Sequence, residues 1–262
     1  MDRRARVVAV LGLGEAGGRL ATELVSLGVD VRSYDPDPDR GVPSTERAPD
    51  PASAAAGSDV VLSVNSARAA LDAAEACLPA LRTETIYADL NTGPPDLKRR
   101  LATLVGGAGA RFADVALLGP IPARGLQAPV LVSGDGARAF AELFEPLGMP
   151  VEVISEKPGD AAALKLLRSV FMKGLAAAVV ESMQAAERAG HADWLAEEIA
   201  AVIGRPFLAR ALEGSRTHAA RRVDEMEAAR NLLVELGVEP RVASASAAQL
   251  AELAAQARGV PS

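Results

Sequence analysis

Several residue types are scarce in this 262-residue chain, and each scarcity excludes something. Cys77 is the only cysteine, so no disulfide can form within the chain, and a reducing compartment follows. Aromatic residues make up only 3%, so aliphatic side chains must form the core. No run reaches the roughly 18 uninterrupted apolar residues of a membrane span, because charged residues interrupt the most apolar stretch, 164–183. We therefore expect a cytoplasmic protein that does not bind a membrane.

Positive charge is also scarce. The chain has 34 acidic and 28 basic residues, a net charge of −6, which argues against nucleic acid as a partner. Only four of the basic residues are lysines (Lys98, Lys157, Lys165 and Lys173), so lysine is not the default cation here. No His, Cys and Asp cluster has metal-ligand spacing, and we expect no metal. Apolar residues make up 49%, enough for the core of one large or two modest domains.

A glycine-rich turn after the first apolar run is the most informative motif. The strand-like run Val7–Leu11 leads into Gly12-Leu13-Gly14-Glu15-Ala16-Gly17, a G-x-G-x-x-G, and a helical pattern follows. In dinucleotide-binding folds the first glycine permits the tight turn, the second admits a pyrophosphate and the third lets the helix pack on the strand. The phosphates then lie at the helix N-terminus. We expect these six residues to bind the cofactor; the alternative is a glycine-rich turn in some other α/β sheet.

An acidic residue lies at the distance from the glycines that ribose recognition requires. Asp35 directly follows the second strand, 29–34, and lies about 20 residues past the motif. A carboxylate there accepts hydrogen bonds from the ribose hydroxyls and repels a 2′-phosphate. Asp37 and Asp39 follow before Arg40, so NAD is favoured over NADP unless Arg40 folds back. The alternative is that Asp35 only begins an Asp-Pro turn.

Strands alternate with helices up to about residue 155. The expected strands are Val7–Leu11, 29–34, 59–64, 85–88, 111–116, Val130–Ser133 and 151–154, and helical segments include 68–81 and 95–106. This alternation predicts an α/β fold with a Rossmann doubly wound, mostly parallel sheet, and an NAD(P)-binding domain over 1–157. Asn65, Asn91 and Thr92 are further candidates for cofactor contacts, and ligands of such sheets bind at the carboxyl ends of the strands.

The pattern becomes helical throughout after Gly159. Asp160 is the expected N-cap of an interdomain helix of about 28 residues, about 42 Å long, that ends at Gly190. Further helices are expected at 193–203, 206–212, 215–236 and 243–257. We expect 158–262 to form this helix and an all-α substrate and dimerisation domain, with the active site in the cleft between the domains. A helical half of about 100 residues has limited area for a core of its own, which favours a homodimer.

Several segments match one family's motifs in order. Asp89-Leu90-Asn91-Thr92-Gly93-Pro94-Pro95 is similar to D-x-S-T-x-x-P, and 112–119 is similar to F-x-D-A-P-V-S-G. Gly159, Lys165 and Ser169 are similar to the glycine, lysine and asparagine of a conserved stretch on an interdomain helix. The chain therefore resembles the β-hydroxyacid dehydrogenase superfamily, which includes 3-hydroxyisobutyrate, tartronate semialdehyde and 6-phosphogluconate dehydrogenases. It resembles a branch with a short helical C-terminal domain.

The resemblance implies an NAD(P)-dependent oxidoreductase that moves a hydride between a nicotinamide cofactor and a small hydroxy acid or its keto or semialdehyde partner. It implies Lys165 as the general acid and base on the substrate hydroxyl. Ser169 stands where the family has an asparagine that orients lysine and substrate. Lys165, Ser169 and Lys173 are four apart and form one polar helix stripe, unless this is a solvated surface helix.

The chain departs from the family at Leu118. Related enzymes have a serine there that holds the substrate carboxylate, and leucine cannot hydrogen-bond. The backbone at Gly119 and the side chain of Arg124 are the candidates for this contact, or the substrate is less polar at that end. The alternative for Arg124 is an exposed loop residue.

A basic cluster in the helical half is the candidate for the far end of the substrate. His218 and Arg222, four apart, suit a carboxylate or phosphate. The alternative is a solvated face that pairs with Glu225. Two other functions stay open: an imine reductase of related architecture, whose members commonly carry Asp or Tyr in place of Lys165, and a non-catalytic NAD-binding regulator, which would bind cofactor without turnover.

Overall fold

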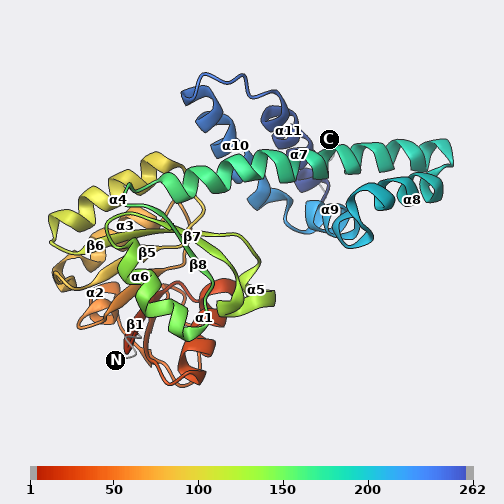
Figure 1. The fold of residues 1–262 in the computed structure, drawn as a ribbon. Helices are drawn as coiled ribbons and strands as arrows, with labels where there is room; N and C mark the ends of the chain where they lie inside the picture. The colour runs from red at the N-terminus through yellow and green to blue at the C-terminus, as the bar shows by residue number, and fades with distance from the viewer. Residues whose placement is uncertain (1–4, 258–262) are drawn as a thin grey trace. The chain divides into compact units, whose positions relative to one another are not determined.

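The computed structural model describes residues 5–257, which divide into two compact units between Lys165 and Leu166 (Figure 1). The first unit contains the β-sheet, and the described part of the second, up to residue 257, contains helices and no strands. Helix α7, Asp160–Ala189, crosses the boundary, and its 30 residues span about 45 Å. The sequence pattern placed the domain boundary where α7 begins, whereas the first turns of α7 belong to the sheet unit.

An eight-stranded sheet organises the first unit. Its strand order is β3-β2-β1-β4-β5-β6-β7-β8, and every neighbouring pair is parallel except β6 and β7. The strands are β1 (Val7–Leu11), β2 (Asp30–Tyr34), β3 (Glu46–Arg47), β4 (Val60–Ser63), β5 (Ile86–Asp89), β6 (Arg111–Leu117), β7 (Val130–Ser133) and β8 (Val151–Ser155). The expected Rossmann-like, mostly parallel sheet is thus confirmed. Strand β3 is a difference, since it is not among the strands expected from the sequence.

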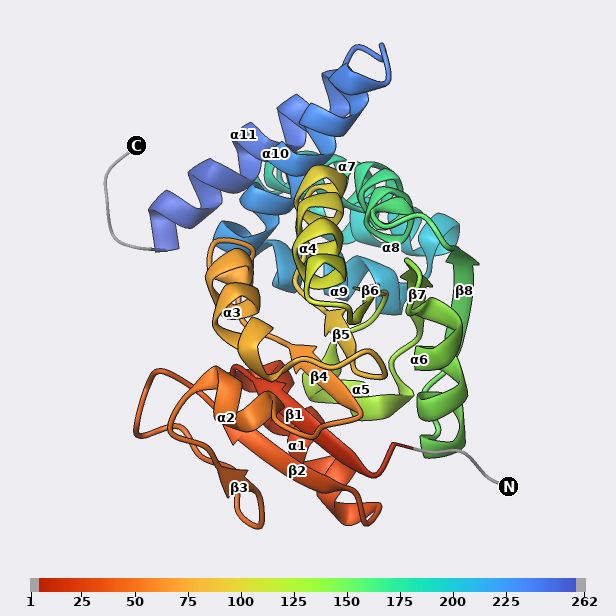
Figure 2. The ribbon, with the colours of Figure 1, turned by 90° about the vertical axis from the view of Figure 1, so that its left-hand side faces the viewer.

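Helices cover both faces of this sheet (Figure 2). Helices α1 (Glu15–Ser26), α5 (Ile121–Arg124) and α6 (Ala137–Phe144) pack on one face; α2 (Pro51–Ala55), α3 (Ala70–Cys77) and α4 (Pro95–Gly107) pack on the other. Single 3-10 turns follow at Leu78–Ala80, Gly125–Gln127 and Glu145–Leu147. Alternate strand residues point to opposite faces, so Val8 and Val10 pack with α1 while Ala9 and Leu11 pack on the other side. The core is largely aliphatic, as the scarcity of aromatic residues requires.

The second unit consists of the rest of α7 and four further helices. These are α8 (Ala192–Ile203), α9 (Arg205–Thr217), α10 (Ala219–Glu235) and α11 (Arg241–Ala257). The sequence pattern placed a break at Gly214, but α9 continues through it and ends before His218. A Cβ at Gly214 would lie 2.5 Å from Nη2 of Arg222, which is the far end of a flexible side chain.

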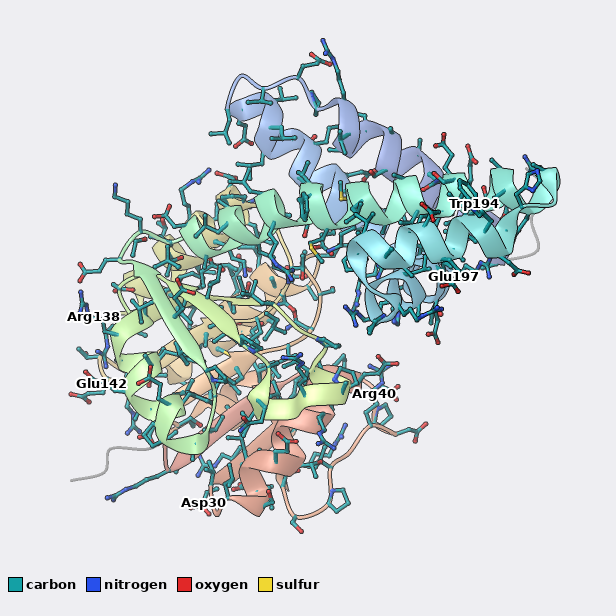
Figure 3. All side chains as sticks on the ribbon, turned by 45° about the vertical axis from the view of Figure 1, so that its right-hand side comes forward. Asp30, Arg40, Arg138, Glu142, Trp194 and Glu197 are labelled. Carbon is teal, nitrogen blue, oxygen red and sulfur yellow. The ribbon has the colours of Figure 1, made fainter. Side chains whose placement is uncertain are left out.

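Large apolar side chains are exposed mainly in the helical unit. On α8, Trp194, which Figure 3 labels, is 66% exposed. Val202, on the same helix, is 84% exposed. Others lie on α7, α10, α11 and the α10–α11 turn: Phe171, Val234, Leu236, Val238 and Val242. None of the helices within residues 5–257 is long and apolar enough to cross a membrane.

Candidate active site

The glycine-rich turn joins β1 to α1 and gives each glycine a different environment. Gly12 has a φ of +97°, and a Cβ there would lie 2.5 Å from the carbonyl oxygen of Val64. A Cβ on Gly17 would lie 1.8 Å from the carbonyl oxygen of Gly12, so only glycine lets α1 start this close to β1. Gly14 has open space, with Arg40 the nearest group at 3.7 Å from an added Cβ. Gly14 is also the N-cap of α1, and no side chain of the described residues caps the helix there. The backbone N–H groups of this turn therefore suit an anionic ligand.

Asp35 follows β2 and lies beside the glycine turn. Its Oδ2 accepts the N–H of Leu13 at 2.6 Å, and its Oδ1 accepts the N–H of Asp37 at 2.9 Å. Arg40 does fold back: its Nη1 lies 3.8 Å from Oδ2 of Asp35, and its Nε lies 3.3 Å from Oδ2 of Asp37. Figure 3 shows Arg40 on the loop after β2. Arg47 lies here as well, since its Nη2 donates to the carbonyl oxygens of Asp35 at 3.1 Å and Asp37 at 3.0 Å.

Asn65 and Asn91 lie together after the carboxyl ends of β4 and β5. Nδ2 of Asn91 donates to Oγ of Ser63 at 3.1 Å, to Oδ1 of Asn65 at 3.0 Å and to Oδ1 of Asp89 at 2.5 Å. Nδ2 of Asn65 donates to the same serine at 3.2 Å. A Cβ on Gly12 would lie 3.2 Å from Cα of Asn65, so this network adjoins the glycine turn. The structure thus brings together residues that the sequence placed at separate strand ends.

Lys165 reaches the next residue of the same loop. Its Nζ donates a hydrogen bond to Oγ1 of Thr92 at 2.6 Å. The lysine comes from the second turn of α7, and the threonine comes from the connection between β5 and α4. The side-chain nitrogen of Lys165 is thereby held beside the loop that carries the predicted cofactor contacts.

A buried lysine lies beneath this loop, and the sequence motifs did not identify it. The side chain of Lys98, in α4, is 1% exposed. Its Nζ donates to Oδ2 of Asp89 at 2.6 Å, to the carbonyl oxygen of Asp89 at 3.1 Å and to that of Asn91 at 2.8 Å. Oδ1 of Asp114 lies 3.2 Å away as an ion pair. Burial alone lowers the pKa of Lys98, but the two carboxylates outweigh it and raise the pKa, so the side chain is charged. The scarcity of lysine was the one sequence signal that pointed to it.

Ser169 and Lys173 form a separate cluster in the helical unit. Ser169 is 1% exposed and donates to Oε1 of Glu225, on α10. Nζ of Lys173 donates to the same oxygen at 2.7 Å and to Oγ of Ser169 at 3.1 Å. Burial lowers the pKa of Lys173, and the attraction of Glu225 opposes this without cancelling it. The stripe expected from the helix spacing therefore has two sets of partners: Thr92 for Lys165, and Glu225 for the other two.

The loop after β6 holds the candidates for the substrate carboxylate. A Cβ on Gly119 would lie 3.4 Å from Cδ of Arg124, so the arginine stem packs over this glycine. Leu118 packs against an apolar cluster that includes Leu131 and Ala161, the second residue of α7. The position of the family's serine thus belongs to an apolar surface beside the first turn of α7.

His218 and Arg222 have structural neighbours in the helical unit. His218 lies between α9 and α10. Nη1 of Arg222 donates to Oγ of Ser215 at 3.0 Å, and burial lowers its pKa, against the attraction of Glu225. Glu225 makes its ion pair with Lys173. Binding of the substrate's far end by His218 and Arg222 stays a prediction.

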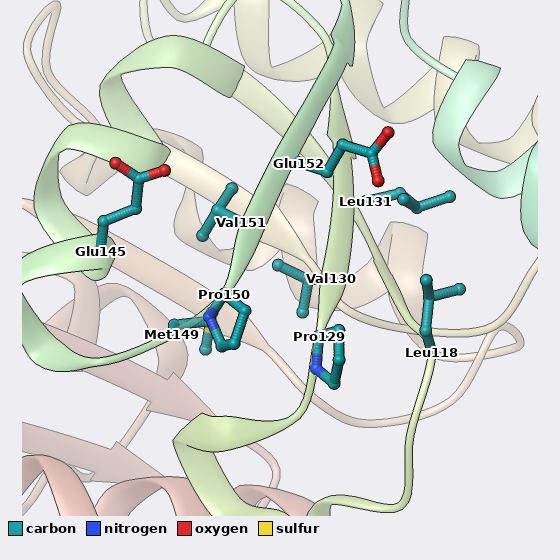
Figure 4. Close-up of a pocket in the computed structure, with 9 residues that line it drawn as sticks. All are labelled: Leu118, Pro129, Val130, Leu131, Glu145, Met149, Pro150, Val151 and Glu152. Carbon is teal, nitrogen blue, oxygen red and sulfur yellow. The ribbon is translucent and has the colours of Figure 1, made fainter.

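An open hollow of about 300 Å³ lies at the amino ends of β7 and β8 (Figure 4). Its lining residues are Leu118, Pro129, Val130, Leu131, Glu145, Met149, Pro150, Val151 and Glu152. It includes neither the glycine turn nor Lys165, and its two charged residues are both acidic. We therefore place no chemistry there. Within residues 5–257, no three His, Cys, Asp or Glu side chains gather as a metal site would require.

Comparison with known proteins gives the family. Residues 7–152 match the family described as the NAD binding domain of 6-phosphogluconate dehydrogenase. The chain belongs to this family. The glycine turn, Asp35 and the Asn91 loop all lie within the matched segment, so the resemblance drawn from the motifs is confirmed. Residues 186–253 match a domain of unknown function, DUF1932.

Individual relatives agree with this assignment. An uncharacterized 28.5 kDa protein of Methanothermus fervidus is 31% identical over 172 residues, 64% of this chain; the match spans only 65% of that relative's length. The conserved protein MTH1747, of unknown function and structurally similar to 3-hydroxyacid dehydrogenases, is 29% identical, with a TM-score of 0.74 over 96% of this chain and 98% of that one. Mycobacterium tuberculosis 3-hydroxyisobutyrate dehydrogenase has the same fold, with a TM-score of 0.80, 22% identity, and coverage of 95% and 94%. The chain thus has a hydroxyacid dehydrogenase-like fold with a dinucleotide-binding domain.

Proposed function

We propose that this protein is an NAD(P)-dependent oxidoreductase that moves a hydride between a nicotinamide cofactor and a small hydroxy acid or its keto or semialdehyde partner. Lys165 is the general acid and base. The observation that carries the proposal is the hydrogen bond of 2.6 Å from Nζ of Lys165 to Oγ1 of Thr92, in a loop that adjoins the glycine turn. It brings a titratable side chain to the sheet edge where ligands of this fold bind.

Different residues of the chain bind the cofactor and transfer the proton. The open backbone at Gly14 and the uncapped start of α1 fit a pyrophosphate, and Asp35 fits the ribose hydroxyls. A bound nicotinamide supplies the hydride acceptor or donor. Lys165 takes the proton of the substrate hydroxyl in oxidation and returns one to the carbonyl oxygen in reduction. Thr92 orients the lysine by accepting one of its N–H bonds.

We propose NAD as the preferred cofactor. Asp35 and Asp37 both face Arg40, and Asp39 adds a third carboxylate to the segment, so a 2′-phosphate would meet net negative charge. The fold does not decide the preference, because Psf3, at 20% identity, was solved with NADP+. Because Arg40 lies beside Asp35, we expect NADP to bind as well, with lower affinity than NAD.

For the substrate, we propose that the backbone at Gly119 and the side chain of Arg124 contact its acidic group. Arg124 already packs over Gly119, and an arginine fork matches a carboxylate. Leu118 makes the adjoining surface apolar. His218 and Arg222 are proposed for the far end of the substrate, since Arg222 keeps a guanidinium in a partly buried setting.

We also propose a homodimer formed through the helical unit. Its support is the set of exposed apolar side chains there, which includes Phe171 at 68% and Trp194 at 66% exposed. Sedimentation velocity at micromolar concentration checks this, and a monomer would contradict it.

The test is turnover followed by nicotinamide absorbance, with NAD and NADP in parallel, after calorimetry has measured binding of the reduced cofactors. The substrates are hydroxy acids, sugar acids, their keto and semialdehyde partners, and cyclic imines. Turnover of a hydroxy acid or its partner with NAD supports the proposal. Turnover of imines alone would instead make the protein an imine reductase. Cofactor binding with no turnover on the whole panel would favour a regulator, and absence of binding would overturn the proposal.

A further inference from the structure

Lys98 contacts two chain segments that are separate in sequence. Its ammonium holds the carbonyl oxygen of Asn91, the residue before Thr92, at 2.8 Å. The same ammonium lies 3.2 Å from Oδ1 of Asp114, in the middle of β6. Of the three hydrogen bonds of this ammonium, two go to Asp89 at the end of β5 and one goes to the loop that follows, while its charge pairs with a carboxylate on β6.

Asp114 in turn caps the start of α7. Its Oδ2 accepts the N–H of Ala162 at 3.0 Å and the hydroxyl of Ser133 at 3.2 Å, and Oγ of Ser133 accepts the N–H of Ala161 at 3.0 Å. Two free N–H groups of the helix are thus satisfied from the sheet. The sequence suggested Asp160 as the cap; its carboxylate accepts the hydroxyl of Ser155 instead. The helix start is therefore tied to β6 and β7.

Lys165 lies one helical turn beyond the two capped residues. One end of its hydrogen bond to Thr92 depends on where α7 starts, and the other depends on the loop that contains Asn91. The ammonium of Lys98 contacts both the Asn91 loop and Asp114, the cap of α7, so both ends of this hydrogen bond depend on it. We propose that Lys98 is a positioning residue, which acts with Asp114 to hold Lys165 and Thr92 at hydrogen-bond distance. The catalytic meaning of this role rests on the proposed function, but the positioning itself does not.

The charges of this network make packing alone a poor explanation. Lys98, Asp89 and Asp114 are all at most 1% exposed, and two carboxylates share one ammonium. Buried ion pairs pay a large desolvation cost, and apolar residues of similar volume often serve stability equally well. The ammonium of Lys98 interacts at the same time with a loop carbonyl and with the carboxylate that caps α7. An apolar side chain can make neither interaction.

The proposed positioning can be tested by NMR, because the small number of lysines makes their signals easy to assign. Protein labelled with ¹³C at lysine Cε gives signals from four lysines, and Lys165→Met identifies the one of interest. Asp114→Asn keeps the shape but removes the charge that connects Lys98 to α7, and Thr92→Val removes the hydroxyl that Lys165 contacts. Ser133→Ala is a milder second variant that keeps every charge. Asp135→Asn is the matched control, because Oδ1 of Asp135 also accepts a backbone N–H, from Phe112 at 2.8 Å, outside this network.

We expect Asp114→Asn to move the Lys165 signal toward its position in Thr92→Val, Ser133→Ala to move it part of the way, and Asp135→Asn to leave it unmoved. In the Thr92→Val background, Asp114→Asn should add no further movement, because the contact it controls is already gone. An unmoved Lys165 signal in folded Asp114→Asn and folded Ser133→Ala overturns the proposal. Independent, additive movements in the double variant also overturn it.

Activity gives a second readout once a substrate is known. Asp114→Asn should lower kcat by about tenfold, as expected for groups in one hydrogen-bond network, with the Kd for NADH unchanged, and the loss should shrink in Thr92→Val. Coupling in the lysine signals without turnover of any substrate would contradict the proposed function but not the positioning. Turnover without coupling in the lysine signals would contradict the positioning but not the proposed function.

Discussion

Replacement of Gly17 by alanine tests the dinucleotide turn most sharply. In an ordinary helix position this change removes backbone freedom and stabilises by about 1 kcal/mol. At Gly17, however, the new Cβ would lie 1.8 Å from the carbonyl oxygen of Gly12, where ordinary contacts begin at about 3.4 Å. The start of α1 must therefore move away from the turn by roughly 1 Å or more, with an overpacking cost of about 1–3 kcal/mol.

The displacement acts on the N–H groups that would hold the pyrophosphate. We expect Gly17→Ala to lower the free energy of unfolding by up to about 2 kcal/mol, once the helix gain of about 1 kcal/mol is subtracted from the overpacking cost. We expect NADH binding to weaken by at least about tenfold, or about 1.4 kcal/mol. Denaturant unfolding measures the first quantity, and calorimetric titration with NADH measures the second.

Gly106→Ala is the matched control. Gly106 is also helical, in α4, and a Cβ there meets nothing within 4 Å. This variant should be as stable as the wild type or more so, and should bind NADH with unchanged affinity. The reasoning is refuted if Gly17→Ala binds NADH as tightly as Gly106→Ala does and is no less stable.

Three further predictions follow from contacts described above. Asp35→Asn keeps an acceptor for the N–H of Leu13 but removes the charge that faces a 2′-phosphate, so the NADP to NAD affinity ratio should rise by about tenfold; an unchanged ratio in parallel titrations would contradict the role of Asp35. Burial raises the pKa of Cys77 to about 12, so a thiol reagent at pH 8 should label it only after unfolding, and rapid labelling of the native protein would be inconsistent with this. Because the unfolded thiol ionises near its ordinary pKa of 9.0, the wild type should lose stability relative to Cys77→Ala as the pH rises above 9. Lys173→Met removes the ammonium that pairs with the carboxylate of Glu225 and should cost about 3 kcal/mol in urea unfolding; a variant as stable as the wild type would show that the pair contributes little.

Much of the fold was predictable because its signals are local. Apolar runs gave the bounds of β1 and β7 to the residue, and the alternation of strands and helices gave the sheet type. Strand β3 was missed because its two residues, Glu46 and Arg47, are charged and pair only through the neighbouring β2. The break at His218 was missed because a glycine such as Gly214 favours a helix end, whereas Gly214 lies inside α9.

The site was predictable only in part, because several of its contacts join residues that are far apart in the sequence. Motif spacing identified Lys165 and Thr92, and the structure brings the two into contact. The network of Lys98 and Asp114 depends on which strands are neighbours, and no local pattern contains that information. The partner of Ser169 was missed likewise, since Glu225 lies on another helix.

The central claim, that Lys165 transfers the proton, is tested most directly by comparing Lys165→Met with Lys157→Met. Lys157 is an exposed lysine just before α7, so its loss controls for removal of one positive charge near the same segment. On the best substrate of the panel, Lys165→Met should lower kcat by about 10²–10⁴-fold, the range for a positioned acid or base, with NADH affinity unchanged. Lys157→Met should turn over like the wild type. Equal turnover by the two variants would contradict the account and remove Lys165 from the mechanism.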